Sequence, residues 1–214
     1  MTESLKVTID AWKDGAAIPE AYAFCVPAEE GHVAMGANRS PGLRWSGGAP
    51  SATESYAVIC HDPDVPSVPD DVNKEGVIIP ADLPRVNFYH WVLVDIPAGV
   101  SALREGVDAD GITARGKPPG PTDHGTRGIN DYTNWFAGNA QMNGDYGGYD
   151  GPCPPWNDER LHHYHFTVYA LAVPSLGLNG TFGGADALAA MDGHILAKGA
   201  WIGTYTLNPS LRDR

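Results

Sequence analysis

Three residues of this chain, Asp62, His90 and His162, combine one carboxylate with two imidazoles, and each stands beside a short apolar run. A carboxylate next to an imidazole favours the protonated ring, so Asp62 could hold one or both histidines as charged donors near neutral pH. Charged N–H donors suit an oxyanion such as phosphate. The residue types therefore predict a small anion pocket, provided that the fold brings the three side chains together.

A glycine-rich segment is a second source of donors. Residues 147–151 read Gly-Gly-Tyr-Asp-Gly, and glycine lets backbone N–H groups approach a ligand closely. Prolines follow at 152, 154 and 155; they donate no hydrogen bond but restrict the shape of the loop. We expect this segment to add backbone donors and a rigid wall to the pocket.

Strand periodicity predicts how these side chains meet. If the strand over 56–60 continues to Asp62, alternation places Asp62 on the same face as Tyr56, Val58 and Cys60. An antiparallel strand over 90–96 would bring in His90 at the same end, on the face of Val92 and Val94. The run 161–168 places His162 and Tyr164 on one side.

The spacing of apolar runs predicts a mainly β fold. The expected strands cover residues 5–9, 22–26, 56–60, 91–96, 166–173 and 201–207. The last four are apolar on both faces, which favours a two-sheet antiparallel sandwich. One amphipathic helix is expected over 186–198, ending at Gly199. Two long connections, 62–87 and 106–155, carry most of the residues with chemical potential.

Composition limits the function classes. The 214 residues are expected to form a single domain over 1–214, and the formal net charge of −12 disfavours nucleic acid as a partner. The start lacks the pattern of a signal peptide, and no apolar run is long enough for membrane insertion. Cysteines 25, 60 and 153 match neither a disulfide framework nor a CxxC metal site, so we expect a reducing, cytoplasmic location.

Two stretches resemble the signatures of a known family. Residues 62–66, Asp-Pro-Asp-Val-Pro, and then 88–91, Phe-Tyr-His-Trp, resemble the first signature of the phosphatidylethanolamine-binding protein family, which includes the Raf kinase inhibitor proteins and their bacterial relatives. Residues 151–155, Gly-Pro-Cys-Pro-Pro, and then 162–164, His-His-Tyr, resemble the second. The order and separation also match over most of the chain, and the Pro-Cys-Pro-Pro form is similar to the bacterial branch.

The resemblance implies a Greek-key β sandwich with a pocket at one end for phosphate groups, nucleotides or phospholipid head groups. Matched residue by residue, the implied pocket positions are Asp62, Pro66, His90, Pro155, His162 and Tyr164, with Gly151 and Pro154 shaping the wall. The chain departs from the family at His163, where the family usually has arginine. Residues 67–86 and 106–135 look like additions, which would cover the pocket mouth or build a homodimer interface.

Three functions remain open. A non-catalytic binding protein without a cofactor is favoured, because the pocket has no positioned nucleophile. A hydrolase is the alternative, in which Asp62, His90 and His162 bind a metal or act as an acid–base set, although HExxH and GxSxG motifs are absent. Regulation of a kinase or protease through a protein partner follows only from the resemblance.

Overall fold

The structure is a computed structural model that describes residues 3–48 and 51–212, and strands dominate it. Its elements in chain order are β1 (Glu3–Ile9), η1 (Glu20–Tyr22), β2 (Cys25–Pro27), β3 (Val33–Met35), β4 (Leu43–Gly47), β5 (Ser55–Pro66), β6 (Arg85–Pro97), β7 (Ala102–Leu103), β8 (Gly120–Thr122), β9 (Gly125–Arg127), α1 (Tyr132–Trp135), β10 (His162–Leu171), α2 (Gly184–Met191), β11 (Ile195–Tyr205) and α3 (Pro209–Arg212). The mainly β prediction is confirmed. None of the helices in the described ranges has the length and apolarity to cross a bilayer.

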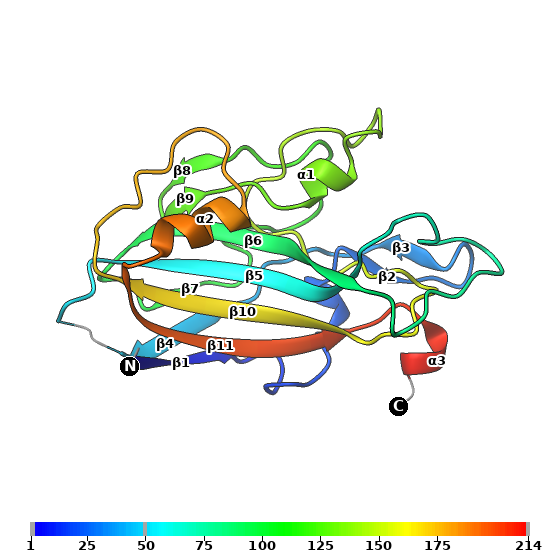
Figure 1. Ribbon diagram of the computed structural model, residues 1–214, viewed down its shortest axis with the longest axis horizontal. Helices are drawn as coiled ribbons and strands as arrows, with labels where there is room; N and C mark the ends of the chain where they lie inside the picture. Colours follow the sequence, from blue (N-terminus) through cyan, green and yellow to red (C-terminus); the bar gives the residue numbers. More distant parts are fainter. Residues whose placement is uncertain (1–2, 49–50, 213–214) are drawn as a thin grey trace.

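Nine strands form one curled sheet in the order β7-β4-β1-β11-β10-β5-β6-β9-β8, and β2 pairs with β3 alone. The long strands β6, β5, β10 and β11 are successive antiparallel neighbours at its centre (Figure 1). β1 produces the curl, because its residues 3–4 pair with β11 while residues 5–9 pair with β4. The finer two-sheet Greek-key description stays a prediction.

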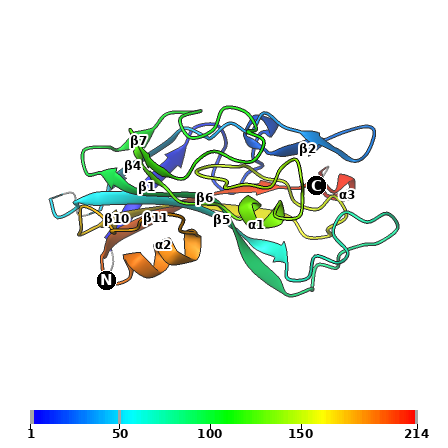
Figure 2. The ribbon, with the colours of Figure 1, turned by 90° about the horizontal axis from the view of Figure 1, so that it is seen from above.

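The main core lies inside the curl. In Figure 2, β1, β4 and β7 lie above the layer that contains β5, β6, β10 and β11, with α2 on the opposite side of that layer. Side chains of β1 and β4, such as Leu5 and Trp45, share one buried cluster with Val58 and Phe166 from the central strands. A smaller cluster packs α2 against the other face. The middle parts of β5, β6 and β10 are therefore buried on both faces, as their apolar runs predict, whereas β11 is mostly half-buried.

The predicted helix over 186–198 is wrong in its second half. α2 covers Gly184–Met191, and residues 195–198 belong to β11. Gly193 adopts φ 78° between them, a conformation that ends a helix, so Ile195 pairs with Leu171 of β10 instead of continuing the amphipathic stripe. Pairing with a long buried strand outweighs the local helical periodicity.

Candidate functional site

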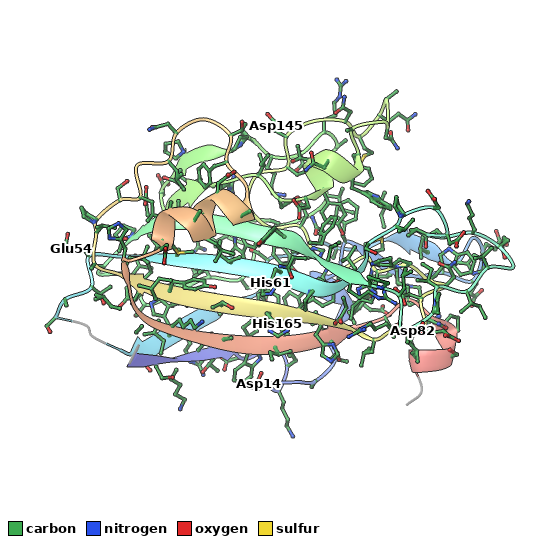
Figure 3. All side chains as sticks on the ribbon, viewed as in Figure 1. Asp14, Glu54, His61, Asp82, Asp145 and His165 are labelled. Carbon is green, nitrogen blue, oxygen red and sulfur yellow. A yellow bond between two sulfur atoms is a disulfide. The ribbon has the colours of Figure 1, made fainter. Side chains whose placement is uncertain are left out.

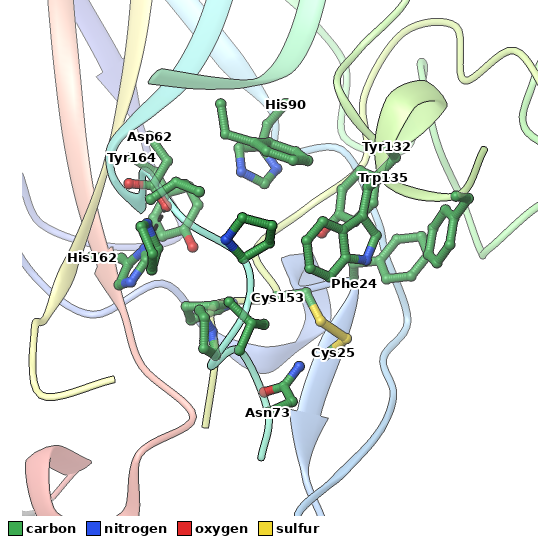
Figure 4. Close-up of a pocket in the computed structure, with 18 of the residues that line it drawn as sticks. Phe24, Cys25, Asp62, Asn73, His90, Tyr132, Trp135, Cys153, His162 and Tyr164 are labelled. Carbon is green, nitrogen blue, oxygen red and sulfur yellow. Dashed lines mark hydrogen bonds and ion pairs between the residues drawn. A yellow bond between two sulfur atoms is a disulfide. The ribbon is translucent and has the colours of Figure 1, made fainter. Parts of the chain in front are cut away.

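A pocket opens at the end of the curl, near the end of β5 and the starts of β6 and β10. Its cavity has a volume of about 180 Å³. Figure 4 shows Asp62, His162 and Tyr164 on one side of it, and Tyr132 and Trp135 on the other. The lining residues are Phe24, Cys25, Met35, Asp62, Val65, Pro66, Pro69, Val72, Asn73, Phe88, His90, Tyr132, Trp135, Phe136, Cys153, Pro154, Pro155, His162 and Tyr164.

Of the predicted pocket residues, all but Gly151 line this cavity. Gly151 lies behind the wall, where its N–H donates to the Asn38 side chain at 2.8 Å and its carbonyl accepts the Tyr132 hydroxyl at 2.8 Å. A Cβ at this position would collide with the backbone of Tyr22, so glycine allows the loop to pack closely. Gly151 shapes the wall without facing the cavity.

His162 is held between two carboxylates. Its Nδ1 donates to Asp62 at 2.7 Å and its Nε2 donates to Asp158 at 3.1 Å. Burial opposes the charged ring, but the attraction of Asp62 and these two hydrogen bonds raise the pKa of His162 to about 9. His162 is therefore charged at neutral pH, and neither of its nitrogens is left to bind a ligand.

Asp62 is held as firmly as its partner. Besides His162, its carboxylate accepts the backbone N–H of Asp64 at 2.8 Å and hydrogen-bonds the Tyr164 hydroxyl. Behind His162, Arg85 donates to Asp158 at 2.5 Å. The two carboxylates of this cluster are thus matched by an imidazolium and a guanidinium, and the formal charge at this side of the pocket is balanced.

His90 reaches the pocket because β6 is irregular at this point. Cys60 of β5 pairs with Trp91 of β6, but the next residue, His61, pairs with Tyr89. His90 is therefore the extra, unpaired residue of a β-bulge. Regular alternation predicts His90 on the face of Val92 and Val94, and that prediction is wrong. The bulge turns the ring to the Trp91 side, where it lines the cavity.

The state of His90 also differs from that of His162. Its Nδ1 bonds the backbone carbonyl of Asp150 at 2.9 Å, and burial lowers its pKa, a shift that the attraction of Asp62 only partly offsets. His90 is therefore neutral near pH 7. The prediction that Asp62 could hold one or both histidines charged is right for one of them, because only His162 contacts the carboxylate directly.

The carbonyl that holds His90 belongs to a buried network. The Asp150 side chain accepts Lys117 Nζ at 3.0 Å, Asn38 Nδ2 at 2.7 Å and Asn130 Nδ2 at 2.9 Å. This network could not be predicted from the sequence, because its partners lie 20 or more residues from Asp150 and form no motif. An isolated lysine in a stretch of prolines and glycines, Lys117, is the one visible signal.

The glycine-rich segment does not supply the predicted donors. Gly147 N–H donates to Lys117, Gly148 N–H to Gly128, and Asp150 N–H to His90, all at backbone carbonyls. The Gly151 N–H is also taken, by Asn38. Four of the five N–H groups of residues 147–151 are therefore already bonded, and the prediction of free donors is wrong for these four, because the loop uses them to fold against the rest of the chain.

Cys25 and Cys153 form a disulfide at the pocket wall, visible in Figure 4. The prediction of no disulfide is therefore wrong. The two cysteines are 128 residues apart in sequence, and only the fold shows that β2 lies against the proline-rich loop. Cys60 is free and buried among the described residues. The cytoplasmic location stays a prediction, without the cysteine argument that supported it.

Both additions contribute to the pocket. Pro69, Val72 and Asn73 line it from the first, and Tyr132 and Trp135 line it from the second. The second also builds an aromatic wall, in which Tyr132 stacks on Phe24 with ring centroids 4.5 Å apart. The Trp135 side chain is 49% exposed, at the mouth. Covering the mouth is thus a role that the structure supports for both segments.

His163 points away from the pocket, as alternation predicts. Its Nδ1 lies 2.8 Å from Asp64, whose other oxygen pairs with Arg160 at 2.7 Å. Arg160 therefore supplies an arginine–carboxylate pair close to the position where the family usually has its arginine.

Comparison with known proteins identifies the family of this chain. Residues 8–206 match the family described as phosphatidylethanolamine-binding protein. A UPF0098 protein of Methanothermobacter thermautotrophicus is 32% identical over 91% of this chain and 94% of its own length. UPF0098 protein YbcL of Escherichia coli is 30% identical over 85% of this chain and 76% of its own length.

Solved structures show the same relationship. The crystal structure of E. coli YbcL, described as a new member of the mammalian PEBP family, superposes with a TM-score of 0.66 and 27% identity, covering 95% of this chain and 98% of that one. A putative PEBP homologue from Chlamydia trachomatis gives a TM-score of 0.62 at 26% identity over the same shares. The chain belongs to the phosphatidylethanolamine-binding protein family.

Proposed function

We propose that this chain is a non-catalytic binding protein whose pocket accepts the phosphate-type head of a small molecule, such as a phosphorylated metabolite, a nucleotide or a phospholipid head group. The observation that carries the proposal is the position of His90, a neutral imidazole that lines the cavity beside a charge-balanced cluster. The family is named for binding a phospholipid whose head contains a phosphate, which supports the same ligand class.

His90 can become the donor that an anion needs. A carbonyl only accepts hydrogen bonds, so the Asp150 contact assigns the proton of the neutral ring to Nδ1 and leaves Nε2 bare. A phosphate ester with a pKa near 6 can deliver a proton to Nε2, or the ring can take one from solvent. Either route creates an imidazolium–phosphate pair, and one proton is taken up from solvent when the ligand arrives as the dianion.

The rest of the pocket favours a ligand with an apolar part. Balanced charges around His162 remove the repulsion that Asp62 and Asp158 would otherwise exert on an anion. The opposite wall is aromatic, formed by side chains such as Phe24 and Tyr132. We infer that the phosphate contacts the His90 side while the organic group packs on the aromatic wall.

Isothermal titration tests the proposal. Tag-free protein is titrated with inorganic phosphate, phosphoethanolamine and adenosine monophosphate at pH 6.0 and pH 7.5. We expect micromolar or weaker binding, tighter at the lower pH, because His90 must gain a proton. His90→Ala should weaken it by at least about tenfold, the cost of one charge-assisted hydrogen bond. His194→Ala, which changes an exposed histidine elsewhere, is the matched control.

Failure of every phosphate probe to bind, or equal binding by His90→Ala, would refute the anion pocket. Phosphorus NMR of the same mixtures tests the hydrolase alternative, since turnover would release inorganic phosphate from either ester. Regulation through a protein partner and homodimer formation are further proposals, independent of phosphate binding. Light scattering at several concentrations decides the homodimer, and a monomer throughout would exclude it.

A further inference from the structure

A pair of histidines lies outside the pocket, on the opposite face of the sheet. His61 of β5 and His165 of β10 are register partners on neighbouring antiparallel strands, and their ring centroids lie 5.1 Å apart. Both side chains are half-buried. Figure 3 shows them on the sheet face beyond the end of α2, so this helix does not cover them.

Among the described residues, the ring nitrogens of His61 and His165 are free to bind a ligand, unlike those of His162. In the described part of the chain, no hydrogen bond or ion pair involves the ring of His61 or His165, whereas the His162 ring uses both nitrogens and the His163 ring bonds Asp64. Burial lowers the pKa of both rings, and a neighbouring histidine lowers each further. Both are therefore neutral at pH 7, the form in which imidazole binds metals.

We propose that His61 and His165 chelate one transition-metal dication on this face, with copper(II) bound more tightly than zinc(II) or nickel(II). Copper(II) stands highest in the affinity order for nitrogen ligands, and two imidazoles with water suit its tetragonal geometry. The net charge of −12 attracts a cation to the surface. No third His, Cys, Asp or Glu among the described residues completes a larger ligand set, so the site has two protein ligands.

Modest movement of the rings would complete the site. Metal–nitrogen bonds of about 2.0 Å require the two nitrogens to approach to roughly 3 Å. Directly opposed residues of antiparallel strands have Cβ atoms about 5 Å apart, so rotation of the side chains can bring the nitrogens together. Because both side chains reach solvent, neither rotation displaces packed core.

Copper titration of the tag-free, full-length protein in a non-chelating buffer tests the proposal. We expect one copper(II) per chain, with the electron paramagnetic resonance signature of two equatorial nitrogens. His61→Ala and His165→Ala should each weaken copper binding by at least about tenfold. Mutating a residue that only hydrogen-bonds a metal ligand already lowers metal affinity by about 10–100-fold, and these variants remove a ligand itself. His194→Ala should leave the affinity unchanged, and circular dichroism checks that each variant is folded.

Equal affinity in wild type, His61→Ala and His165→Ala would overturn the proposal. A signal from one nitrogen, or loss of the copper in His90→Ala instead, would also overturn it, the latter by placing the metal in the pocket. Because the pair and the pocket lie on opposite faces, failure here leaves the phosphate proposal intact, and failure of phosphate binding leaves this one intact.

Discussion

His90 and His162 line the same cavity, yet their surroundings drive their pKa values in opposite directions. His162 meets two carboxylates directly, whereas His90 meets a backbone carbonyl. Burial opposes the charge on both, so the direct ion pairs decide the outcome. One ring thus serves as a fixed charge that balances the carboxylates, and the other remains able to gain a proton with a ligand.

The raised pKa of His162 predicts alkaline destabilisation. Its folded value is about 9 against a model value of 6.5, so its contribution is fully present below about pH 6.5 and lost as pH rises through 9. The shift corresponds to about 3 kcal/mol. Urea denaturation at pH 6.5, 8 and 9 should show stability that falls as the pH rises. The NMR signal of the His162 ring should titrate near pH 9. Titration of that signal near pH 6.5 would contradict the expectation.

Among the elements, the disulfide ties β2 to the proline-rich loop. Cys25→Ser/Cys153→Ser should lower the free energy of unfolding by about 2–4 kcal/mol, because the cross-link restricts the unfolded chain and closes a long loop. Urea denaturation with and without dithiothreitol measures the effect. Reduction should shift the wild-type midpoint and leave the double variant unchanged. A wild-type midpoint that does not respond to reduction would rule the bond out as a stabilising element.

The loop that carries Asp150 is stabilised by an ion pair with Lys117. Lys117→Met should cost about 3 kcal/mol, since it leaves a buried carboxylate without its cation. Adding Asp150→Asn should recover part of the loss, because an amide needs no counter-charge. Lys198→Met, at an exposed lysine of β11, serves as the control in thermal denaturation. Stability equal to wild type in Lys117→Met would show that Asn38 and Asn130 suffice.

Sequence periodicity predicted the central strands and three of the side chains that line the pocket, and failed where structure depends on contacts between distant segments. Asp62, His162 and Tyr164 follow regular alternation, and their faces were predictable. His90 was assigned to the wrong face because a bulge arises from how two strands pair, which one strand's pattern does not contain. The same holds for the disulfide and for the Asp150 network, whose partners lie far apart in sequence.

At the scale of the whole molecule, charge works against one proposed ligand and for the other. A net charge of −12 repels a phosphate anion at long range and attracts a divalent cation. Local balance around His162 removes the short-range repulsion, but the long-range field remains. Salt screens such a field over a Debye length of about 10 Å at 0.1 M. The two sites should therefore respond to ionic strength with opposite signs.

Titrations from 0.02 to 0.2 M potassium nitrate test this expectation on one preparation. Phosphate binding should tighten as salt is added, because screening weakens the repulsion between the anion and the acidic surface. Copper(II) binding at His61 and His165 should weaken over the same range. If salt acted by altering the stability of the fold, both affinities would change in the same direction. Opposite slopes therefore indicate an electrostatic effect. Phosphate binding that weakens with salt would contradict this expectation, because it would mean that attraction to the protonated His90 outweighs repulsion by the acidic surface.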